Sequence, residues 1–398
     1  NYTKIYDSHN KPIDNCLIIY FPNPHSFTGE DVIEISSHGG DFIPKAILGM
    51  LYNEKVRQAA PGEFSYRAFL NGKIDLVQAE SISGIISAKT TKNADVQLGN
   101  LDGRLSDFIV KLKSESIYLL TVLEHELDFA EGEISFIRID DIKSTIISLK
   151  SNIENILESS NFGDKINSGI RVVLCGKPNA GKSSLFNRLS GSNRSIVTNI
   201  AGTTRDTIET WLEISGIPVC IVDTAGIIDS NDKVESIGVE KSNNEIVNSD
   251  IIMVLDEENP IEFYEQNNLR NLEKDSILIH TKSDIKPSSV YSQKIIEISV
   301  KNDAGISDLY TELSTLLKKN ISYNYTADPV VVSHRQKQLL TNANLVLVEA
   351  INILGDSFDA VILSSLLREF TGLLEELLGK ITNEDIFDNL FSSFCIGK

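Results

Sequence analysis

Hydrophobic and polar positions change their spacing along the 398 residues of this chain. Near the amino end, short apolar runs alternate with turn residues, which predicts strands at 16–21 and 31–36 and a helix near 44–52. From about residue 76 to 161 the apolar residues recur at helical spacing, and this texture returns from about 333 onward. In between, apolar runs at 171–175, 219–222, 251–256 and 277–280 alternate with helical patterns, which predicts a mostly parallel α/β sheet.

These patterns predict a multidomain chain of the α/β and α+β classes, in which an α/β domain is inserted into an α-helical domain. Insertion is feasible where the two ends of a domain lie close together. The expected domains are a small α+β domain at 1–72, a first helical part at 73–168, the inserted domain at 169–322 and a second helical part at 323–398. The chain starts at Asn1 within a strand-rich pattern, so we expect its natural start to lie upstream.

A phosphate-binding loop is predicted at Gly176-Lys177-Pro178-Asn179-Ala180-Gly181-Lys182-Ser183, because this sequence follows an apolar run and precedes a helical pattern. Lys182 is expected to contact the β and γ phosphates, and the Ser183 hydroxyl to bind Mg²⁺. A glycine-rich turn that ends in Lys-Ser by chance is the alternative, and further motifs downstream weigh against it.

Three later segments complete the predicted nucleotide site. Asp223-Thr224-Ala225-Gly226 ends an apolar run, where the Asp can hold Mg²⁺ through water and the Gly N–H can face the γ-phosphate. Gly202-Thr203-Thr204-Arg205-Asp206 offers hydroxyls in a covering loop, with Thr204 as the second Mg²⁺ ligand. Thr281-Lys282-Ser283-Asp284 looks like the guanine-reading NKxD element of GTPases with Thr in place of Asn, and Ser299-Val300-Lys301 resembles the last base-contacting loop.

Guanine is the expected base, because Asp284 can accept hydrogen bonds from its N1–H and exocyclic amine, which adenine does not offer in that geometry. The alternative is that Lys282 and Asp284 form only a surface pair. The residues expected to contact GTP are Asn179, Ala180, Gly181, Lys182, Ser183, Ser184, Thr198, Asn199, Ile200, Ala201, Gly202, Thr203, Thr204, Asp223, Thr224, Ala225, Gly226, Thr281, Lys282, Ser283, Asp284, Ser299, Val300 and Lys301.

Composition narrows the setting in which this domain works. Hydrophobic residues make up 41% and charged residues 23%, as in ordinary soluble proteins, and no apolar run approaches a membrane span. The four cysteines lack metal-ligand spacing, which favours a reducing cytoplasm without structural zinc. The net charge of -19 argues against a chain that wraps nucleic acid by itself, so an RNA partner would need a local basic patch or help from another protein.

Taken together, the motifs resemble the MnmE (TrmE) family of tRNA modification GTPases, and the resemblance covers essentially the whole chain. The combination of an inserted GTPase domain with a CxGK tail is highly specific. The segments that carry the resemblance outside the nucleotide motifs are Phe27-Thr28-Gly29-Glu30-Asp31, His38-Gly39-Gly40, Pro61-Gly62-Glu63-Phe64, Ala68-Phe69-Leu70-Asn71 and the terminal Cys395-Ile396-Gly397-Lys398.

The resemblance implies a homodimer whose amino-terminal domain binds folate and dimerises. With the flavoprotein MnmG, as a heterotetramer, such a protein would add an aminomethyl or carboxymethylaminomethyl group to C5 of the tRNA wobble uridine. The one-carbon unit would come from 5-formyl-tetrahydrofolate or a related tetrahydrofolate. Glu34, Lys73 and Lys398 fall at the family's folate-contacting positions, and Cys395 lies near that pocket with a credible thiol role; without the family it would be an unremarkable tail cysteine.

Ile227 stands where many switch GTPases place a water-orienting Gln. The resemblance supplies a substitute for it: a K⁺ ion that neutralises charge developing on the phosphates across paired GTPase domains. Asn179, Thr198, Ile200 and Thr203 match the positions around this ion.

Glu235 matches the family's carboxylate that orients the attacking water through a second water. On sequence alone it would be read as a solvated residue on a helix face. Together with Lys182 and Cys395 it forms our set of candidate catalytic residues.

Two other functions stay open at this point. One is a stand-alone regulatory GTPase, for example in ribosome assembly, which leaves the CIGK tail and the folate-domain motifs unexplained. The other is a non-enzymatic folate-binding scaffold, against which the intact Lys182, Ser183 and Asp223 speak.

Overall fold

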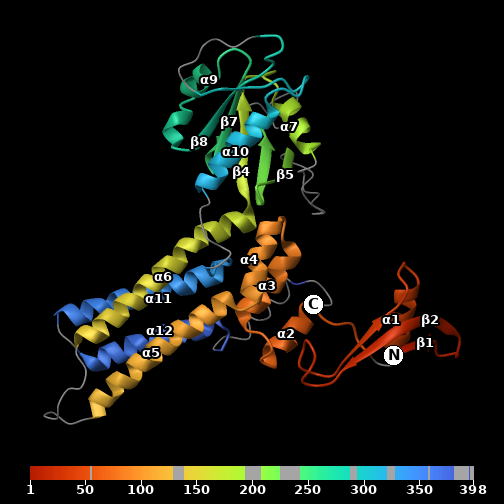
Figure 1. Ribbon diagram of the computed structural model, residues 1–398, viewed down its shortest axis with the longest axis vertical. Coiled ribbons are helices and arrows are strands. Elements are labelled where there is room, and N and C mark those ends of the chain that lie inside the picture. The colour runs from red at the N-terminus through yellow and green to blue at the C-terminus, as the bar shows by residue number, and fades with distance from the viewer. Residues whose placement is uncertain are drawn as a thin grey trace, which may run out of the picture. The chain divides into compact units, whose positions relative to one another are not determined.

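The computed structural model describes residues 1–53, 56–128, 139–192, 208–224, 243–286, 294–320, 328–356, 359–380 and 394. The chain forms two compact units. The first contains residues 1–86, 98–154 and 334–398, and the second contains 87–97 and 155–333. Figure 1 colours the elements of both units along the chain.

The first unit begins with an antiparallel sheet of order β1-β2-β3 that is covered on one face by helix α1. Side chains of Ile5, Cys16 and Ile47 are buried between the sheet and the helix. The predicted strands and helix of this region are confirmed, and β1 is an addition to them. The elements are β1 (Tyr2–Tyr6), β2 (Pro12–Phe21), β3 (Val32–Ser36) and α1 (Ile43–Asn53).

Helices form the rest of this unit, as the apolar spacing predicts. Along α12 the buried side chains recur every three or four residues and pack against α11 and α5. Asp359 caps α12 by accepting hydrogen bonds from the backbone N–H groups of Val361 and Ile362. The helices are α2 (Glu63–Leu70), α3 (Leu76–Ser87), α4 (Thr91–Leu101), α5 (Arg104–Asp128), α6 (Ile139–Ser168), α11 (His334–Asp356) and α12 (Ala360–Leu377), with α4 and α6 continuing into the second unit.

The second unit is built on a six-stranded sheet of order β5-β6-β4-β7-β8-β9. All neighbouring strands are parallel except β5 and β6, so the predicted mostly parallel sheet is confirmed. The strands β6 and β7 are buried along their whole length, which is typical of a sheet covered by helices on both faces. The strands are β4 (Ile170–Gly176), β5 (Ile208–Ile214), β6 (Ile217–Asp223), β7 (Ile251–Asp256), β8 (Asp275–His280) and β9 (Ile296–Glu297).

Cys175 and Cys220 are buried in this sheet as predicted, and burial raises the pKa of each thiol to about 12. Both therefore behave as small core side chains. The helical elements beside the sheet are α7 (Lys182–Ser190), α9 (Pro260–Gln266), the 3₁₀ turn η2 (Leu269–Leu272) and α10 (Ile306–Asn320).

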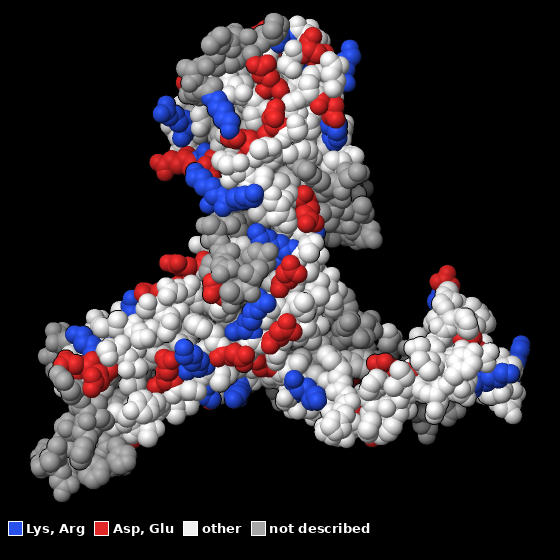
Figure 2. All heavy atoms as spheres, in the orientation of Figure 1, with Lys and Arg blue, Asp and Glu red and all other residues white. Residues whose placement is uncertain are grey.

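On the face shown in Figure 2, Lys and Arg side chains (blue) are interspersed with Asp and Glu side chains (red) over much of the surface. The part formed by β1, β2 and α1 is mostly uncharged on this face. Large apolar side chains of the amino-terminal sheet and its helix are exposed, including Tyr2, Ile33 and Leu48. Of the helices in the described ranges, none is both long enough and apolar enough to cross a membrane.

Candidate nucleotide and folate sites

The phosphate loop connects β4 to α7, and its backbone conformation requires particular residues. Gly176 ends β4 with φ 152°, and a Cβ there would lie 2.0 Å from the Leu255 carbonyl oxygen on β7. Gly181 has φ 87° and Asn179 has φ 64°, both in the left-handed region that Gly and Asn adopt most readily. The sequence therefore folds into a tight loop because only these residues permit its path.

Lys182 begins α7 and points back into the loop. Its Nζ donates hydrogen bonds to the carbonyl oxygens of Gly176 and Lys177, each at 2.9 Å. Burial lowers the pKa of Lys182, while the nearby Asp223 carboxylate acts in the opposite direction. A desolvated ammonium in the centre of a phosphate loop is prepared to exchange neutral carbonyl acceptors for anionic phosphate oxygens.

Asp223 lies at the carboxyl end of β6, beside Leu174 of β4 in the sheet register. It is buried, and the next residue, Thr224, donates its hydroxyl to the Leu174 carbonyl oxygen at 2.7 Å. Ser183 is exposed in the first turn of α7. A hydroxyl and a carboxylate are the hard oxygen donors that Mg²⁺ prefers, so the residues present fit this ion.

The predicted guanine-reading segment follows β8 and meets the phosphate loop. The Thr281 hydroxyl, 3% exposed, donates a hydrogen bond to the carbonyl oxygen of Ala180 at 2.9 Å. Asp284 Oδ1 accepts a hydrogen bond from the Ser299 hydroxyl at 2.8 Å, so the two predicted base-contacting segments lie together. Lys282, with φ 55°, pairs with Glu257. These contacts place those predicted nucleotide-binding residues that the structure describes at the carboxyl end of the sheet. Open α/β sheets bind their ligands at this end.

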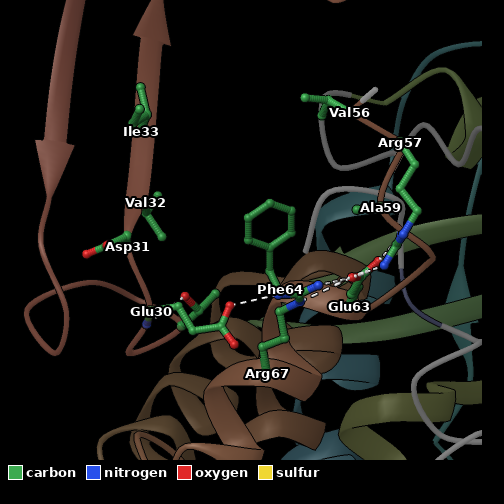
Figure 3. Close-up of a pocket in the computed structure, with 11 residues that line it drawn as sticks. Glu30, Asp31, Val32, Ile33, Val56, Arg57, Ala59, Glu63, Phe64 and Arg67 are labelled. Carbon is green, nitrogen blue, oxygen red and sulfur yellow. Dashed lines mark hydrogen bonds and ion pairs between the residues drawn. The ribbon is translucent and has the colours of Figure 1, made fainter. Parts of the chain in front are cut away.

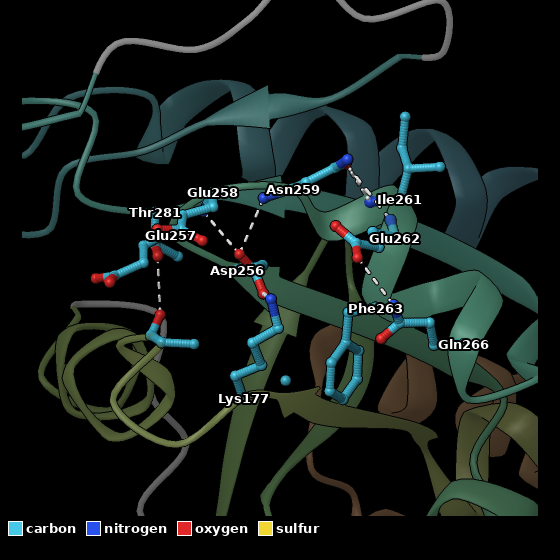
Figure 4. A network of polar contacts seen from close by, with 12 residues as sticks. Lys177, Asp256, Glu257, Glu258, Asn259, Ile261, Glu262, Phe263, Gln266 and Thr281 are labelled. Carbon is cyan, nitrogen blue, oxygen red and sulfur yellow. Dashed lines mark hydrogen bonds and ion pairs between the residues drawn. The ribbon is translucent and has the colours of Figure 1, made fainter.

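Asp256 is a member of this site that the sequence analysis did not single out (Figure 4). It ends β7, is 1% exposed, and forms an ion pair with Lys177 of the phosphate loop at 3.0 Å. Its Oδ1 accepts hydrogen bonds from the backbone N–H groups of Glu258 and Asn259. Burial alone would raise the pKa of Asp256, but these donors and Lys177 outweigh it and hold the pKa below its ordinary value. The only sequence signal was an Asp directly after a continuous apolar strand.

Several predicted residues lie outside the described part of the chain: Thr198, Asn199, Ile200, Ala201, Gly202, Thr203, Thr204, Ala225, Gly226, Glu235, Cys395 and Lys398. The second Mg²⁺ ligand, the water-orienting Glu and most of the K⁺ positions therefore stay predictions. Asn179 is described, and its side chain is exposed on the phosphate loop.

The amino-terminal region contains a hollow of about 400 Å³ beside β3 and α2 (Figure 3). Glu63 lies between two arginines, with its carboxylate accepting bonds from Arg57 at 2.6 and 2.7 Å and from Arg67 at 2.7 and 3.1 Å. Hydrogen bonds from Arg57, from the Ala60 N–H and from Arg67 hold the pKa of Glu63 at about 2. Arg67 also pairs with Glu30 at 2.7 Å. The other residues that line the hollow are Thr28, Asp31, Val32, Ile33, Val56, Ala59 and Phe64.

The predicted folate residues in the described ranges lie near this hollow in sequence but do not line it. Glu34 is exposed on β3, directly after Ile33. Lys73 follows α2, and its Nζ donates a hydrogen bond to the Pro24 carbonyl oxygen at 3.0 Å.

Comparisons with known proteins cover both units. The family model for the MnmE helical domain matches residues 76–395, and the model for the GTP-binding protein TrmE N-terminus matches residues 1–73. The tRNA modification GTPase MnmE of Clostridioides difficile (strain 630) is 38% identical over 407 residues, covering 100% of this chain and 88% of that protein. Its counterpart of the same name from Aquifex aeolicus (strain VF5) is 37% identical over 405 residues, covering 99% and 89%.

Among solved structures, Aquifex aeolicus Era bound to GDP·AlF4⁻ is 23% identical, covers 44% of this chain and 66% of that chain, and superposes with a TM-score of 0.30.

Proposed function

This chain belongs to the MnmE family of tRNA modification GTPases, and we propose that it binds and hydrolyses GTP where the phosphate loop meets the segment 281–284. The main structural support for this location is the hydrogen bond between the Thr281 hydroxyl and the Ala180 carbonyl, which joins the two segments. The domain bounds proposed with it are 1–72, 73–168, 169–322 and 323–398.

In this proposal, each described residue has a role that its surroundings support. Lys182 leaves its carbonyl acceptors and contacts the β and γ phosphates. Asp284, which Ser299 holds through a hydrogen bond, accepts from the N1–H and the amine of guanine. Ser183 and Thr204 would bind Mg²⁺ directly and Asp223 would hold it through water; the ion would neutralise charge that develops on the phosphates.

Potassium and a second copy of the chain complete the proposed GTPase. Asn179, whose exposed side chain lies on the phosphate loop, contacts K⁺ together with Thr198, Ile200 and Thr203. Glu235 orients the attacking water. The homodimer is supported by the number of large apolar side chains exposed on the amino-terminal sheet, among them Tyr2, Tyr20 and Ile33, because exposed apolar surface is favourable to bury against a partner.

The proposed biological reaction is modification of C5 of the tRNA wobble uridine together with the flavoprotein MnmG. Glu34, Lys73 and Lys398 would hold the tetrahydrofolate, with Cys395 beside it. The exposure of Glu34 on β3 supports this role, because a carboxylate there can accept hydrogen bonds from a ligand. The net charge of -19 disfavours tRNA binding by the chain alone, so the proposal includes the partner's help in binding tRNA. The described free cysteines, all buried, agree with a cytoplasmic location.

The test is GTP turnover by the purified chain in KCl and in NaCl at matched ionic strength, with Asn179→Ala alongside. We expect turnover to be at least about tenfold faster in KCl, because a positioned cation stabilises transition-state charge, and we expect the variant to lose this difference. Asn187→Ala, the same change at an exposed position of α7 outside the phosphate loop, serves as the matched control. Equal turnover in both salts would refute the K⁺ assignment, and tighter binding of ATP than of GTP would refute the base assignment.

A further inference from the structure

The second unit contains a groove of about 700 Å³ that the nucleotide site does not use. It is bordered by the end of α7, the turn after β5 and one face of α10, all labelled or adjoining labelled elements in Figure 1. Its lining residues Ile214 and Ile306 are buried in the hydrophobic core, so they form the floor. The exposed lining consists mainly of hydroxyl and charged side chains: Arg188, Ser215, Asp303, Ser307, Thr311, Thr315 and Lys318.

Two basic residues, Arg188 and Lys318, and one acidic residue, Asp303, line this groove, although the chain as a whole carries a net charge of -19. Lys318 is exposed in the last turn of α10, and within the described residues no carboxylate forms an ion pair with it. Lys92 lies against the turn after β5, since a Cβ added to Gly216 would be 3.1 Å from the Lys92 Cβ. Burial lowers the pKa of Lys92, and the positive charge of Lys318 lowers it further.

An ion pair and a pair of hydroxyl groups make up other polar parts of the groove lining. Arg188 uses Nε and Nη2 in a two-bond pair with Asp303 at 2.7 and 2.9 Å, so the carboxylate at this end of the groove is neutralised. The hydroxyls of Ser215 and Ser314 are 2.7 Å apart, and only one of their two protons is needed between them. The other proton can be donated to a ligand.

We propose that this groove receives a phosphate group of the tRNA backbone, contacted by Lys318 and by the Ser215–Ser314 hydroxyl pair. The inference rests on the proposed tRNA function. Phosphate contacts in nucleic-acid complexes come mainly from Lys, Arg, Ser and Thr, the side-chain types exposed here. An acidic protein partner would instead call for exposed apolar or aromatic anchors at the centre of the surface. Ile214 and Ile306 are buried, and the aromatic lining residue, Tyr310, is partly buried against the core, so the groove does not present a central cluster of such anchors.

The experiment compares Lys318→Gln and Lys318→Glu with the same changes at Lys319. Lys319 is the adjacent residue on α10 and does not line the groove, so changes at the two positions share the helix end and the change of charge, while Lys319 pairs with Asp275. Thermal unfolding checks that all four variants fold. The probe is a fluorescent tRNA transcript with uridine at the wobble position, titrated by anisotropy into the full chain, with and without the flavoprotein, between about 50 and 200 mM salt.

We expect Lys318→Gln to raise the Kd for tRNA by about threefold to tenfold and to reduce the slope of log affinity against log salt by about one. Lys318→Glu should have a larger effect, while both Lys319 variants stay near the wild type. Equal effects at the two positions, or none at Lys318, would overturn the groove assignment while leaving tRNA binding intact. Equal weakening of polyglutamate binding would identify an acidic-protein surface and also overturn it. If the wild type binds tRNA in neither arm, the proposed function itself fails.

Discussion

Replacing Thr281 by Val tests whether the base-reading segment supports the phosphate loop. Valine has nearly the shape of threonine but cannot donate the hydrogen bond to the Ala180 carbonyl. Both residues are almost completely buried, at 3% and 2% exposure, so water cannot replace the lost donor easily. A net hydrogen bond contributes about 1 kcal/mol, and a buried group left unsatisfied costs about 1–3 kcal/mol. We therefore expect the free energy of unfolding to fall by about 1–2 kcal/mol.

Nucleotide affinity should fall with it, because the loop that Lys182 and Ser183 present is no longer held at Ala180. If the free loop of the variant loses its ordered path and GDP binding has to restore it, the Kd for GDP rises by up to about fivefold to thirtyfold, which corresponds to about 1–2 kcal/mol. The assays are urea unfolding and titration with a fluorescent GDP analogue. Thr281→Ser keeps the hydroxyl and should retain most of the affinity.

Thr341→Val is the matched control, since Thr341 donates to the Lys337 carbonyl at 2.7 Å but is exposed on α11. It should change neither the affinity nor the stability by more than about 0.5 kcal/mol. Unchanged GDP affinity in Thr281→Val, with the control equally unchanged, would show that the two loops are not coupled through this bond.

Three further changes test other parts of the structure. Asp284→Asn should weaken GTP binding by about 2–4 kcal/mol and shift the preference toward xanthosine triphosphate, because the Asn amide places an N–H group against the N–H groups of guanine. A competition titration in which the variant still favours GTP would contradict the role of Asp284 in reading guanine. Glu63 has a folded-state pKa of about 2 against an ordinary 4.5, so its stabilisation is present above about pH 4.5 and is lost as pH falls toward 2. Glu63→Gln should flatten thermal unfolding against pH over that window, and an unaltered profile would refute this. Gly169→Ala would place a Cβ 2.5 Å from the ring of Trp211, the single tryptophan, at φ 81°; we expect about 2–4 kcal/mol lower stability and altered tryptophan emission, and an unchanged spectrum and stability would contradict the contact.

The sheet and phosphate loop could be predicted because their signals are local. A continuous apolar run, a turn with glycines and a following helical pattern define β4, the loop and α7 without reference to the rest of the chain. The antiparallel strand β5 was missed, although Ser215 and Gly216 form a two-residue turn with φ 55° and 80° that joins it to β6. This hairpin signal was present in the sequence. A prediction focused on parallel α/β units passed over it.

The role of Asp256 could not be predicted in the same way. Lys177 and Asp256 are far apart in sequence and meet only because β4 and β7 are neighbours in the sheet. Arg67 makes one contact that the sequence predicts and one that it does not. Its pair with Glu63 follows from helical i, i+4 spacing, whereas its pair with Glu30 depends on tertiary packing. Sequence patterns therefore predicted which segments form the candidate site, and the structure was needed to identify the contacts between them.

Those contacts affect how a substitution of Lys182 must be interpreted. The phosphate loop is held at Lys177 by Asp256, at Ala180 by Thr281, and internally by Lys182, whose Nζ bonds two carbonyls of the loop itself. Because the backbone is already ordered, we expect GTP binding at the proposed site mainly to require that Lys182 exchange neutral acceptors for charged ones, a favourable exchange for a desolvated ammonium. Lys182→Ala removes the charge but also leaves both carbonyls without their donor. Its loss of affinity therefore contains a contribution from the nucleotide-free loop, and the size of that contribution is given by the accompanying loss of stability without nucleotide.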